Sequence, residues 1–225
     1  CSYNEYLVMV TKNGIIKKPP ASEYESIRKS GKIAITLKEG DELISIFKTT
    51  GNDNIFLATR NGMAICFNEN DARAVGRTAS GVKAIDLADG DYVVGAEPVR
   101  EDSKVLLVTD GGYGKCTDLT SFRIQHRGGK GLKAYKITEK TGNIIGISMV
   151  NDSEELIMVT SEGVVIRIRI KDIATTTGRI TQGVRLIKLD DGVTVVSMDK
   201  ISAEDAVEEE SEENNTEVTT ETTEE

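Results

Sequence analysis

The sequence has 225 residues, a formal net charge of −9, three cysteines and no tryptophan. No apolar run approaches the roughly 18–20 residues that a membrane span needs, and the opening CSYNEYLVMV lacks the basic-then-apolar order of a signal peptide. Residues 201–225 hold eleven acids and no base, which leaves 37 − 11 = 26 acids against 28 bases in residues 1–200. We therefore expect a slightly basic folded domain over residues 1–202 and a disordered acidic tail over 203–225. Because the sequence does not begin with Met, we interpret it as a fragment or a processed chain.

Four copies of a Thr-x-x-Gly motif occur along the chain, each between two short apolar runs. They are LVMVTKNGIIKK at 7–18, IFLATRNGMAICF at 55–67, VLLVTDGGYGKC at 105–116 and LIMVTSEGVVIRI at 156–168. Runs rich in Val, Ile and Leu that are bounded by Gly and Asn indicate strands, and Asn-Gly between two such runs is a strong hairpin signal. Each copy therefore predicts a β-hairpin.

Further strands are predicted after each hairpin. A polar stretch such as PASEYESI or NENDARAV, which is compatible with a single helical turn, leads to an Arg ahead of a Gly-led strand. These segments are RKSGKIAITL from Arg28, GRTASGVKAIDL from Gly76, RGGKGLKAYKI from Arg127 and GRITQGVRLIKL from Gly178. A polar turn and a last strand close each unit, as in EGDELISI, DGDYVVGA, KTGNIIGI and DDGVTVVSM. The units cover about 5–50, 52–101, 103–151 and 154–200, with about four strands each.

A small sheet of this kind cannot bury both of its faces alone, so the units must stack. All-β repeats of about 50 residues indicate the blades of a β-propeller. The sequence has no Trp and no Gly-His…Trp-Asp signature, which excludes a WD40 array. We expect the core to include the apolar positions of the Gly-led strands: Ile35, Leu37, Ile85, Leu87, Ile187 and Leu189.

The stretch RIQHRGGKGLKAY at 123–135 combines basic side chains, glycines and the only histidine, and it raises several alternatives. A nucleotide-binding P-loop needs Ser or Thr after its Lys, but Lys130 is followed by Gly131. Catalysis by His126 is disfavoured because other units place Lys29, Ala79 or Thr181 near this position. The DGD and EGD turns are too short for a calcium loop, and the scattered cysteines favour neither a zinc site nor a disulfide framework. DNA phosphate binding and simple solvated charges on strand edges remain.

Recurrence of the basic residues favours the DNA interpretation. Glycines beside cations let a phosphate approach backbone N–H groups, and contacts to phosphate carry no sequence information. The predicted DNA-binding residues are Arg28, Lys32, Arg77, Lys83, Gln125, Arg127, Gly128, Gly129, Lys130, Gly131, Lys133, Arg179 and Arg185. The hairpin ends add Lys17, Lys18, Lys115, Arg167 and Arg169. We predict no catalytic residue and no metal ligand, and we hypothesise that the tail carboxylates compete with DNA for these cations.

The four units, and above all QHRGGKG at 125–131, resemble the C-terminal domain of the gyrase A protein of bacteria, a DNA topoisomerase component, and its box motif Q-R-R-G-G-R-G. The resemblance implies a β-pinwheel, a propeller-like disc whose blades exchange a strand and whose basic rim wraps double-stranded DNA. It also implies a cytoplasmic A2B2 DNA gyrase holoenzyme, formed with the gyrase B protein, that introduces negative supercoils. ATP and Mg would act on the gyrase B protein and the cleavage core, so this chain alone would need no cofactor.

Two departures from the family pattern matter. The family domain has six blades, so we expect two N-terminal blades to be absent from this sequence. The box belongs to the family's first blade, whereas QHRGGKG lies in the third unit here, with His126 in place of Arg. No tyrosine of this chain matches the family's active-site tyrosine. The alternatives are the related ParC domain of topoisomerase IV and a propeller that serves as a protein-interaction platform.

Overall fold

A computed structural model describes residues 5–26 and 29–202 of the chain. Arg28, Cys1 and the acidic tail at 203–225 lie outside the described residues. Sixteen strands and four short 3-10 helices make up the described part, which confirms the all-β prediction. The 3-10 helices include Ala21–Tyr24 and Glu69–Asp71, where single helical turns were predicted, and the others are Leu119–Ser121 and Ile170–Asp172. None of these helices is long and apolar enough to cross a membrane.

The strands form four sheets, which we call blades 1 to 4. Blade 1 has the order β3 (Leu43–Thr49), β1 (Tyr6–Thr11), β2 (Ile15–Lys17) and β6 (Val82–Lys83). Blade 2 has the order β7 (Val93–Pro98), β4 (Asn54–Thr59), β5 (Met63–Asn68) and β10 (Leu132–Lys133). Blade 3 consists of β11 (Ile144–Val150), β8 (Lys104–Thr109), β9 (Tyr113–Asp118), β14 (Thr175–Thr176) and β15 (Val184–Arg185). Blade 4 has the order β16 (Val195–Ile201), β12 (Glu155–Thr160) and β13 (Val165–Arg169).

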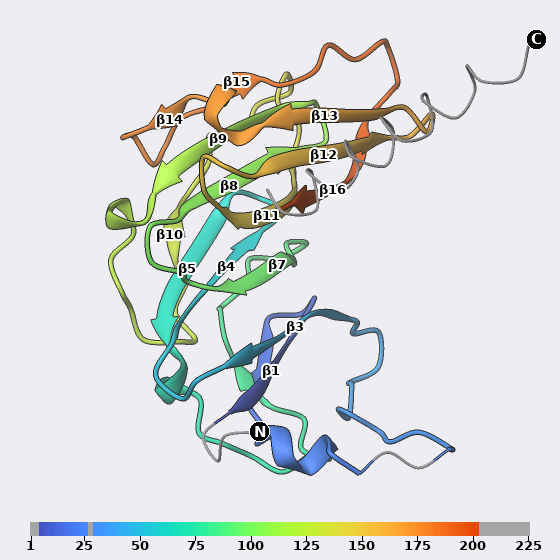
Figure 1. The fold of residues 1–225 in the computed structure, drawn as a ribbon, viewed down its shortest axis with the longest axis vertical. Helices are drawn as coiled ribbons and strands as arrows, with labels where there is room; N and C mark the ends of the chain where they lie inside the picture. Colours follow the sequence, from blue (N-terminus) through green and yellow to red (C-terminus); the bar gives the residue numbers. More distant parts are fainter. Residues whose placement is uncertain (1–4, 27–28, 203–225) are drawn as a thin grey trace, which may run out of the picture.

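The last strand of blades 1, 2 and 3 comes from the following repeat. β6 pairs with β2, β10 with β5, and β15 with β9, each in antiparallel register. Figure 1 shows blade 1 at the bottom, blade 2 above it, and blades 3 and 4 together in the upper part, with β15 of blade 3 at the top. The strand exchange implied by the family resemblance is therefore present. The donated strands are only two residues long, although longer Gly-led strands were expected in segments such as GRTASGVKAIDL.

The Thr-x-x-Gly motif closes each hairpin through one repeated hydrogen bond. In blade 1 the Thr11 hydroxyl accepts from the amide of Ile15 at 3.2 Å, and the amide of Gly14 donates to the Thr11 carbonyl at 3.0 Å. The same threonine-hydroxyl contact recurs at 3.1–3.2 Å in the other three blades. Gly14 has a φ of +76°, which glycine adopts without steric cost.

The glycine that starts each donated strand is required by close approach of two backbones. Gly131 has a φ of +75°, and a Cβ there would lie 2.5 Å from the carbonyl oxygen of Ala64 on β5. Gly81 has a φ of +89° and the same 2.5 Å approach to the Ile16 carbonyl on β2. The equivalent Gly31 has a φ of +74°, but a Cβ added there would have no neighbouring atom within 4 Å, because no described strand pairs with its segment.

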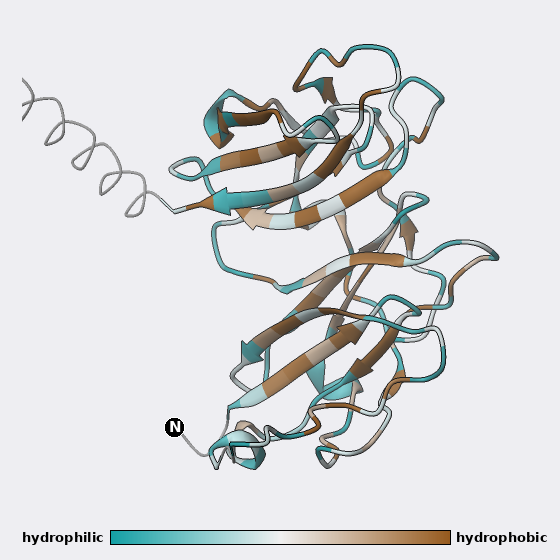
Figure 2. Cartoon of the chain, turned by 90° about the vertical axis from the view of Figure 1, so that its right-hand side faces the viewer, coloured by the Kyte–Doolittle hydropathy of each residue, from teal (hydrophilic) through white to brown (hydrophobic). Residues whose placement is uncertain are grey.

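Three hydrophobic cores lie between successive blades rather than within them. One combines Val8 and Ile16 of blade 1 with Leu57 and Phe67 of blade 2, and the other two join blades 2 and 3 and blades 3 and 4. Figure 2 shows the apolar strands of the stacked sheets in brown and most connecting loops in teal or white. Among the predicted core residues, Ile85 is buried and Leu87, Ile187 and Leu189 pack against the cores. The prediction was wrong for Leu37, which is 41% exposed because no described hairpin covers it.

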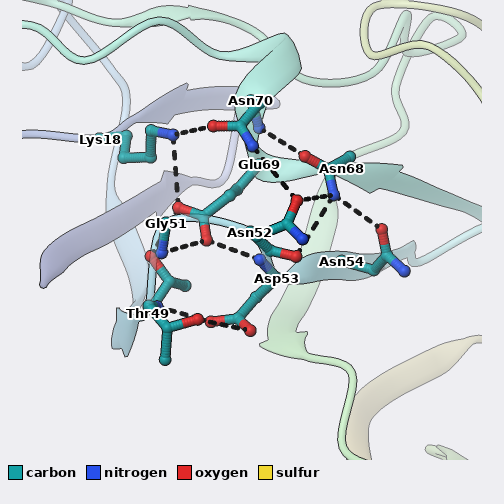
Figure 3. Close-up of polar contacts among 10 residues, drawn as sticks. Lys18, Thr49, Gly51, Asn52, Asp53, Asn54, Asn68, Glu69 and Asn70 are labelled. Carbon is teal, nitrogen blue, oxygen red and sulfur yellow. Dashed lines mark hydrogen bonds and ion pairs between the residues drawn. The ribbon is translucent and has the colours of Figure 1, made fainter. Parts of the chain in front are cut away.

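A buried ion pair joins the first two repeats. The Glu69 carboxylate is fully buried and accepts hydrogen bonds from the amides of Gly51 (2.9 Å) and Asp53 (2.7 Å) and from the Thr49 hydroxyl (2.8 Å). The Lys18 ammonium completes the arrangement at 3.3 Å, as Figure 3 shows. These partners hold their positions around the Glu69 carboxylate, because a buried charge that loses its partners lowers the stability of the fold.

Candidate nucleic-acid interface

The predicted basic loops lie at the outer edge of the blades because each one precedes a donated strand. We call residues 76–83, 126–133 and 178–185 the rim loops. Their last residues form β6, β10 and β15, the strands farthest from the inner strands β3, β7 and β11 in the sheet order. The corresponding segment of the first repeat, 29–37, forms no strand, and Arg28 lies outside the described residues.

Each recurring arginine contacts the corresponding segment of the preceding repeat. The Arg127 guanidinium donates to the Lys83 carbonyl at 3.0 Å, and that of Arg179 donates to the Lys133 carbonyl at 2.7 Å. Arg77 donates in the same way to the carbonyl of Ile33. Each of these carbonyls belongs to the second residue after the strand-leading glycine. One interaction therefore repeats three times along the outer edge and links each repeat to its predecessor.

A second carbonyl fixes the plane of two of these guanidinium groups. Arg127 Nε donates to the carbonyl of Asp71 at 2.7 Å, and Arg179 Nη1 donates to the carbonyl of Ser121 at 3.2 Å. Both carbonyls belong to the last residue of a 3-10 helix in the preceding repeat. Arg77, Arg127 and Arg179 are half-buried, and part of their donor capacity serves the fold.

Backbone hydrogen bonds also link the rim loops 126–133 and 178–185 to the residues just after the preceding donated strand. The amide of Gly128 donates to the Ala84 carbonyl at 2.6 Å, and the amide of Asp86 donates to the Gly129 carbonyl at 2.9 Å. Farther along, the amide of Lys136 donates to the Thr181 carbonyl at 3.0 Å. The three loops therefore form one continuous band along the outer strands.

The lysines of the band differ in their partners. Lys130 and Lys133 are exposed, whereas the Lys83 ammonium is 2.8 Å from the Asp86 carboxylate. Lys32 stands one position earlier in its motif, and its ammonium donates to the carbonyl of Glu23 at 3.1 Å. Lys130 and Lys133 are thus the lysines of the band with the freest access to solvent.

Other residues of the QHRGGKG stretch are held by blade 2. The amide of Gln125 donates to the Cys66 carbonyl at 2.8 Å, and the buried Gln125 side-chain amide nitrogen has no hydrogen-bond partner among the described residues. His126 is 97% exposed, with Nδ1 3.1 Å from the Asp71 carboxylate, which also accepts from the amide of Arg127 at 3.2 Å.

Two lysines that were predicted to contact DNA are instead buried and donate hydrogen bonds to the rim loops. Lys115 is fully buried, and its ammonium donates to the Arg179 carbonyl at 2.5 Å and to the Thr181 hydroxyl at 3.1 Å. Burial lowers the pKa of Lys115 to about 8, with a further decrease from the nearby Arg179. Lys17 donates to the carbonyls of Ala34 and Arg77, and burial lowers its pKa as well.

The prediction was therefore wrong for Lys17 and Lys115, and also for Lys18 with its Glu69 partner. Sequence reasoning could not foresee this, because most of the acceptor groups come from the following repeat. It also missed the exposed Lys140 and Lys188, which do not belong to the repeated Arg and Lys positions. Both lie beside Tyr113 and Arg185 in a cavity of about 310 Å³.

Strand-exchanged blades in an open series define a β-propeller of the pinwheel type. The chain matches the family described as "DNA gyrase C-terminal domain, beta-propeller" over residues 5–50, 53–100, 103–151 and 154–202. These matches cover most of the chain, which therefore belongs to the DNA gyrase C-terminal domain family.

Relatives by sequence are DNA gyrase A proteins. That of Halalkalibacterium halodurans is 56% identical over 202 residues, which are 90% of this chain and 24% of the relative. That of Clostridium acetobutylicum is 49% identical over 201 residues, 89% of this chain and 24% of the relative. The chain thus spans about a quarter of the length of these relatives.

Solved structures agree on the fold. The C-terminal domain of DNA topoisomerase IV superposes with a TM-score of 0.86 at 28% identity, over 96% of this chain and 68% of that one. The DNA gyrase A C-terminal domain superposes with a TM-score of 0.79 at 25% identity, over 89% of this chain and 67% of that one.

Proposed function

We propose that this chain binds double-stranded DNA along the band of rim loops and bends it around the outer edge of the blades. The observation that carries the proposal is the continuity of the band, in which three glycine-rich basic loops are joined to one another by hydrogen bonds. A continuous cationic edge suits the phosphate backbone, which presents one charge every 1.7 Å or so of duplex axis. Lys130, Lys133 and Arg185 supply cations to this edge that have no acidic partner among the described residues, and Lys83 supplies one that is paired with Asp86.

Within a complete gyrase, the bound DNA would pass from this edge to the cleavage core, which lies outside the chain. The A2B2 enzyme, with its ATP and Mg on the gyrase B protein and the cleavage core, would perform ATP-dependent negative supercoiling in the bacterial cytoplasm. This chain would contribute DNA wrapping and no chemical step. The identity of the sequence relatives favours gyrase over topoisomerase IV, although the topoisomerase IV domain superposes well.

The test is a gel-shift titration of the full 225-residue chain against linear duplexes of about 40 and about 150 base pairs, repeated over a range of salt. Smooth bending costs on the order of 1–6 kcal/mol per 20–30 base pairs, so a wrapped duplex needs many phosphate contacts. We expect tighter binding to the longer duplex, independence of sequence, and a log–log salt slope near 0.9 per neutralised phosphate. Absence of binding to either duplex at low salt would overturn the proposal.

A lysine pair variant tests the location of the interface. Lys130→Gln with Lys133→Gln should lower the salt slope by about 2, since each residue accounts for one phosphate contact. Lys171→Gln removes an exposed lysine of blade 4 outside the rim loops and is the matched control. A blade 4 double variant, Lys171→Gln with Lys200→Gln, removes the same number of charges as the rim variant. If both double variants lower the salt slope equally, the interface lies elsewhere.

A further inference from the structure

A pocket between blades 3 and 4 collects three cations around one buried tyrosine. Tyr113 starts β9 and is 6% exposed. Arg185 Nε lies 3.2 Å from the Tyr113 hydroxyl, and its guanidinium lies 5.7 Å from the centre of the ring. The Lys140 ammonium lies 5.5 Å from the same ring, and Lys188 lines the cavity beside them. We call these four residues the Tyr113 pocket.

No acid among the described residues neutralises this cluster. The cavity lining contains Lys140, Arg185 and Lys188 and no carboxylate. Across residues 5–26 and 29–202, no carboxylate oxygen lies within 4.0 Å of any of these three cations. Like charges held together without a counter-charge repel, and a bound anion removes the repulsion. The hydrogen bond from Arg185, supported by Lys140, also lowers the pKa of the Tyr113 phenol.

The same position between blades 1 and 2 shows what a neutralised version looks like. Lys83 corresponds to Arg185, each two residues after its strand-leading glycine, and Asp86 corresponds to Lys188. Lys83 and Asp86 form an ion pair of 2.8 Å, whose hydrogen bond lowers the pKa of the Asp86 carboxyl. Ile15 stands in place of Tyr113 there. The change from Asp to Lys therefore converts an internal ion pair into an unneutralised cation cluster.

Acids also accompany the corresponding hairpin of blade 2. Met63 replaces Tyr113, and it shares a cavity with Asp89, Asp91 and Lys130. Of the three blade junctions in the described part of the chain, the third alone combines the phenol, three cations and an acid-free lining. The pocket is thus a local feature of one junction rather than a property of every repeat.

We propose that the Tyr113 pocket binds a phosphate group, and that in the wrapped complex this group is a backbone phosphodiester of duplex DNA. Arg185 and the Tyr113 hydroxyl would donate hydrogen bonds to it, and Lys140 and Lys188 would supply charge. This inference rests on the proposed DNA-binding function. A single built pocket at one junction would fix one point of the duplex on the band, whereas exposed lysines hold it without a fixed register.

The test exchanges the charges of the two junctions. Lys188→Asp recreates at the third junction the pattern of Lys83 and Asp86, so we expect the salt slope of DNA binding to fall by about 2, because Lys188 is lost and Arg185 becomes paired. Lys171→Asp makes the same charge change at an exposed site outside the pocket and should lower the slope by at most about 1. Asp86→Lys should raise the slope. Thermal unfolding of each variant checks that the fold is retained.

A second readout follows the phenol itself. With ¹³C-labelled tyrosine, the Tyr113 ring resonances are monitored by NMR on addition of duplex DNA or of pyrophosphate, with Tyr92 as internal reference. Shifts at Tyr113 with both ligands, abolished by Lys188→Asp, would support the inference. Shifts with pyrophosphate alone would assign the pocket to a free anion and overturn the DNA assignment. The DNA assignment would also be overturned if DNA binds without shifting the Tyr113 resonances and Lys188→Asp binds DNA as tightly as the parent. If no duplex binds at all, the proposed function fails, and the pyrophosphate result then decides separately whether the pocket is an anion site.

Discussion

Replacing Arg179 with Gln separates its contribution to the fold from any contact with phosphate. The guanidinium of Arg179 donates to two carbonyls of the preceding repeat, at 2.7 and 3.2 Å, and is half-buried. Hydrogen bonds that involve a charged donor contribute about 1.5–3 kcal/mol each when well shielded. Because Lys133 is exposed and water can replace the lost donor there, we expect the free energy of unfolding to fall by about 1–2 kcal/mol in total.

For a domain of this size, about 1 kcal/mol corresponds to roughly 2–4 °C in Tm, so Arg179→Gln should lower Tm by about 2–8 °C. Differential scanning calorimetry in the absence of DNA measures this change. Arg123→Gln is the matched control, because Arg123 is exposed and its side chain makes no hydrogen bond within the described residues; it should stay within about 0.5 kcal/mol of the parent. An unchanged Tm for Arg179→Gln, combined with a DNA-binding salt slope lower by about 0.9, would refute the interblade role and assign Arg179 to phosphate instead.

Three further predictions concern the fold around the rim loops. Gly131→Ala should lower the free energy of unfolding by more than about 2 kcal/mol, because the added Cβ clashes with the backbone and the φ is positive. Gly31→Ala, with nearly the same φ but open space around the added Cβ, should lower it by about 1 kcal/mol, and urea unfolding measures both. Glu69→Ala should cost about 3–5 kcal/mol, since it leaves the buried Lys18 ammonium without its counter-charge, and a loss below about 1 kcal/mol in urea would contradict the arrangement in Figure 3. Folding lowers the pKa of Lys115 from 10.5 to about 8, so between these two pH values the side chain is protonated in the unfolded chain and deprotonated in the folded one. Raising the pH from 8 to 10.5 should therefore increase the free energy of unfolding of the parent relative to that of Lys115→Met. A difference that stays flat over this range would exclude the shift.

The sequence predicted the features that depend on neighbouring residues. Thr11 and Gly14, for example, lie three residues apart and close their own turn by hydrogen bonds, so the hairpins could be identified from local patterns. The short helical turns followed from the repeats, and the strand exchange between blades followed from the family resemblance. Each of these signals repeats along the chain, which made it easy to distinguish from chance.

Features that depend on pairing between repeats could not be predicted in the same way. Lys115 carries the charge of a surface residue, but three acceptors from residues 178–181 surround its ammonium. Leu37 has the alternation of a core residue, but no described hairpin covers it. The Tyr113 pocket was missed because Lys140 and Lys188 interrupt the repeated pattern on which the prediction rested. Departures between equivalent positions, such as Asp86 and Lys188, were the signal that could have located it.

The pairing of β10 with β5 has a consequence for synthesis on the ribosome. β5 ends at Asn68 and β10 begins at Leu132, so 132 − 68 − 1 = 63 residues lie between the two strands of one sheet. At about 5–20 residues per second, translation needs roughly 3–13 seconds to supply the strand that completes blade 2. During that interval the growing chain exposes a hydrogen-bonding edge, and each new repeat ends the exposure of the one before it. The blades therefore complete their sheets in the order of synthesis, and each completed sheet no longer offers an unpaired edge to other nascent chains.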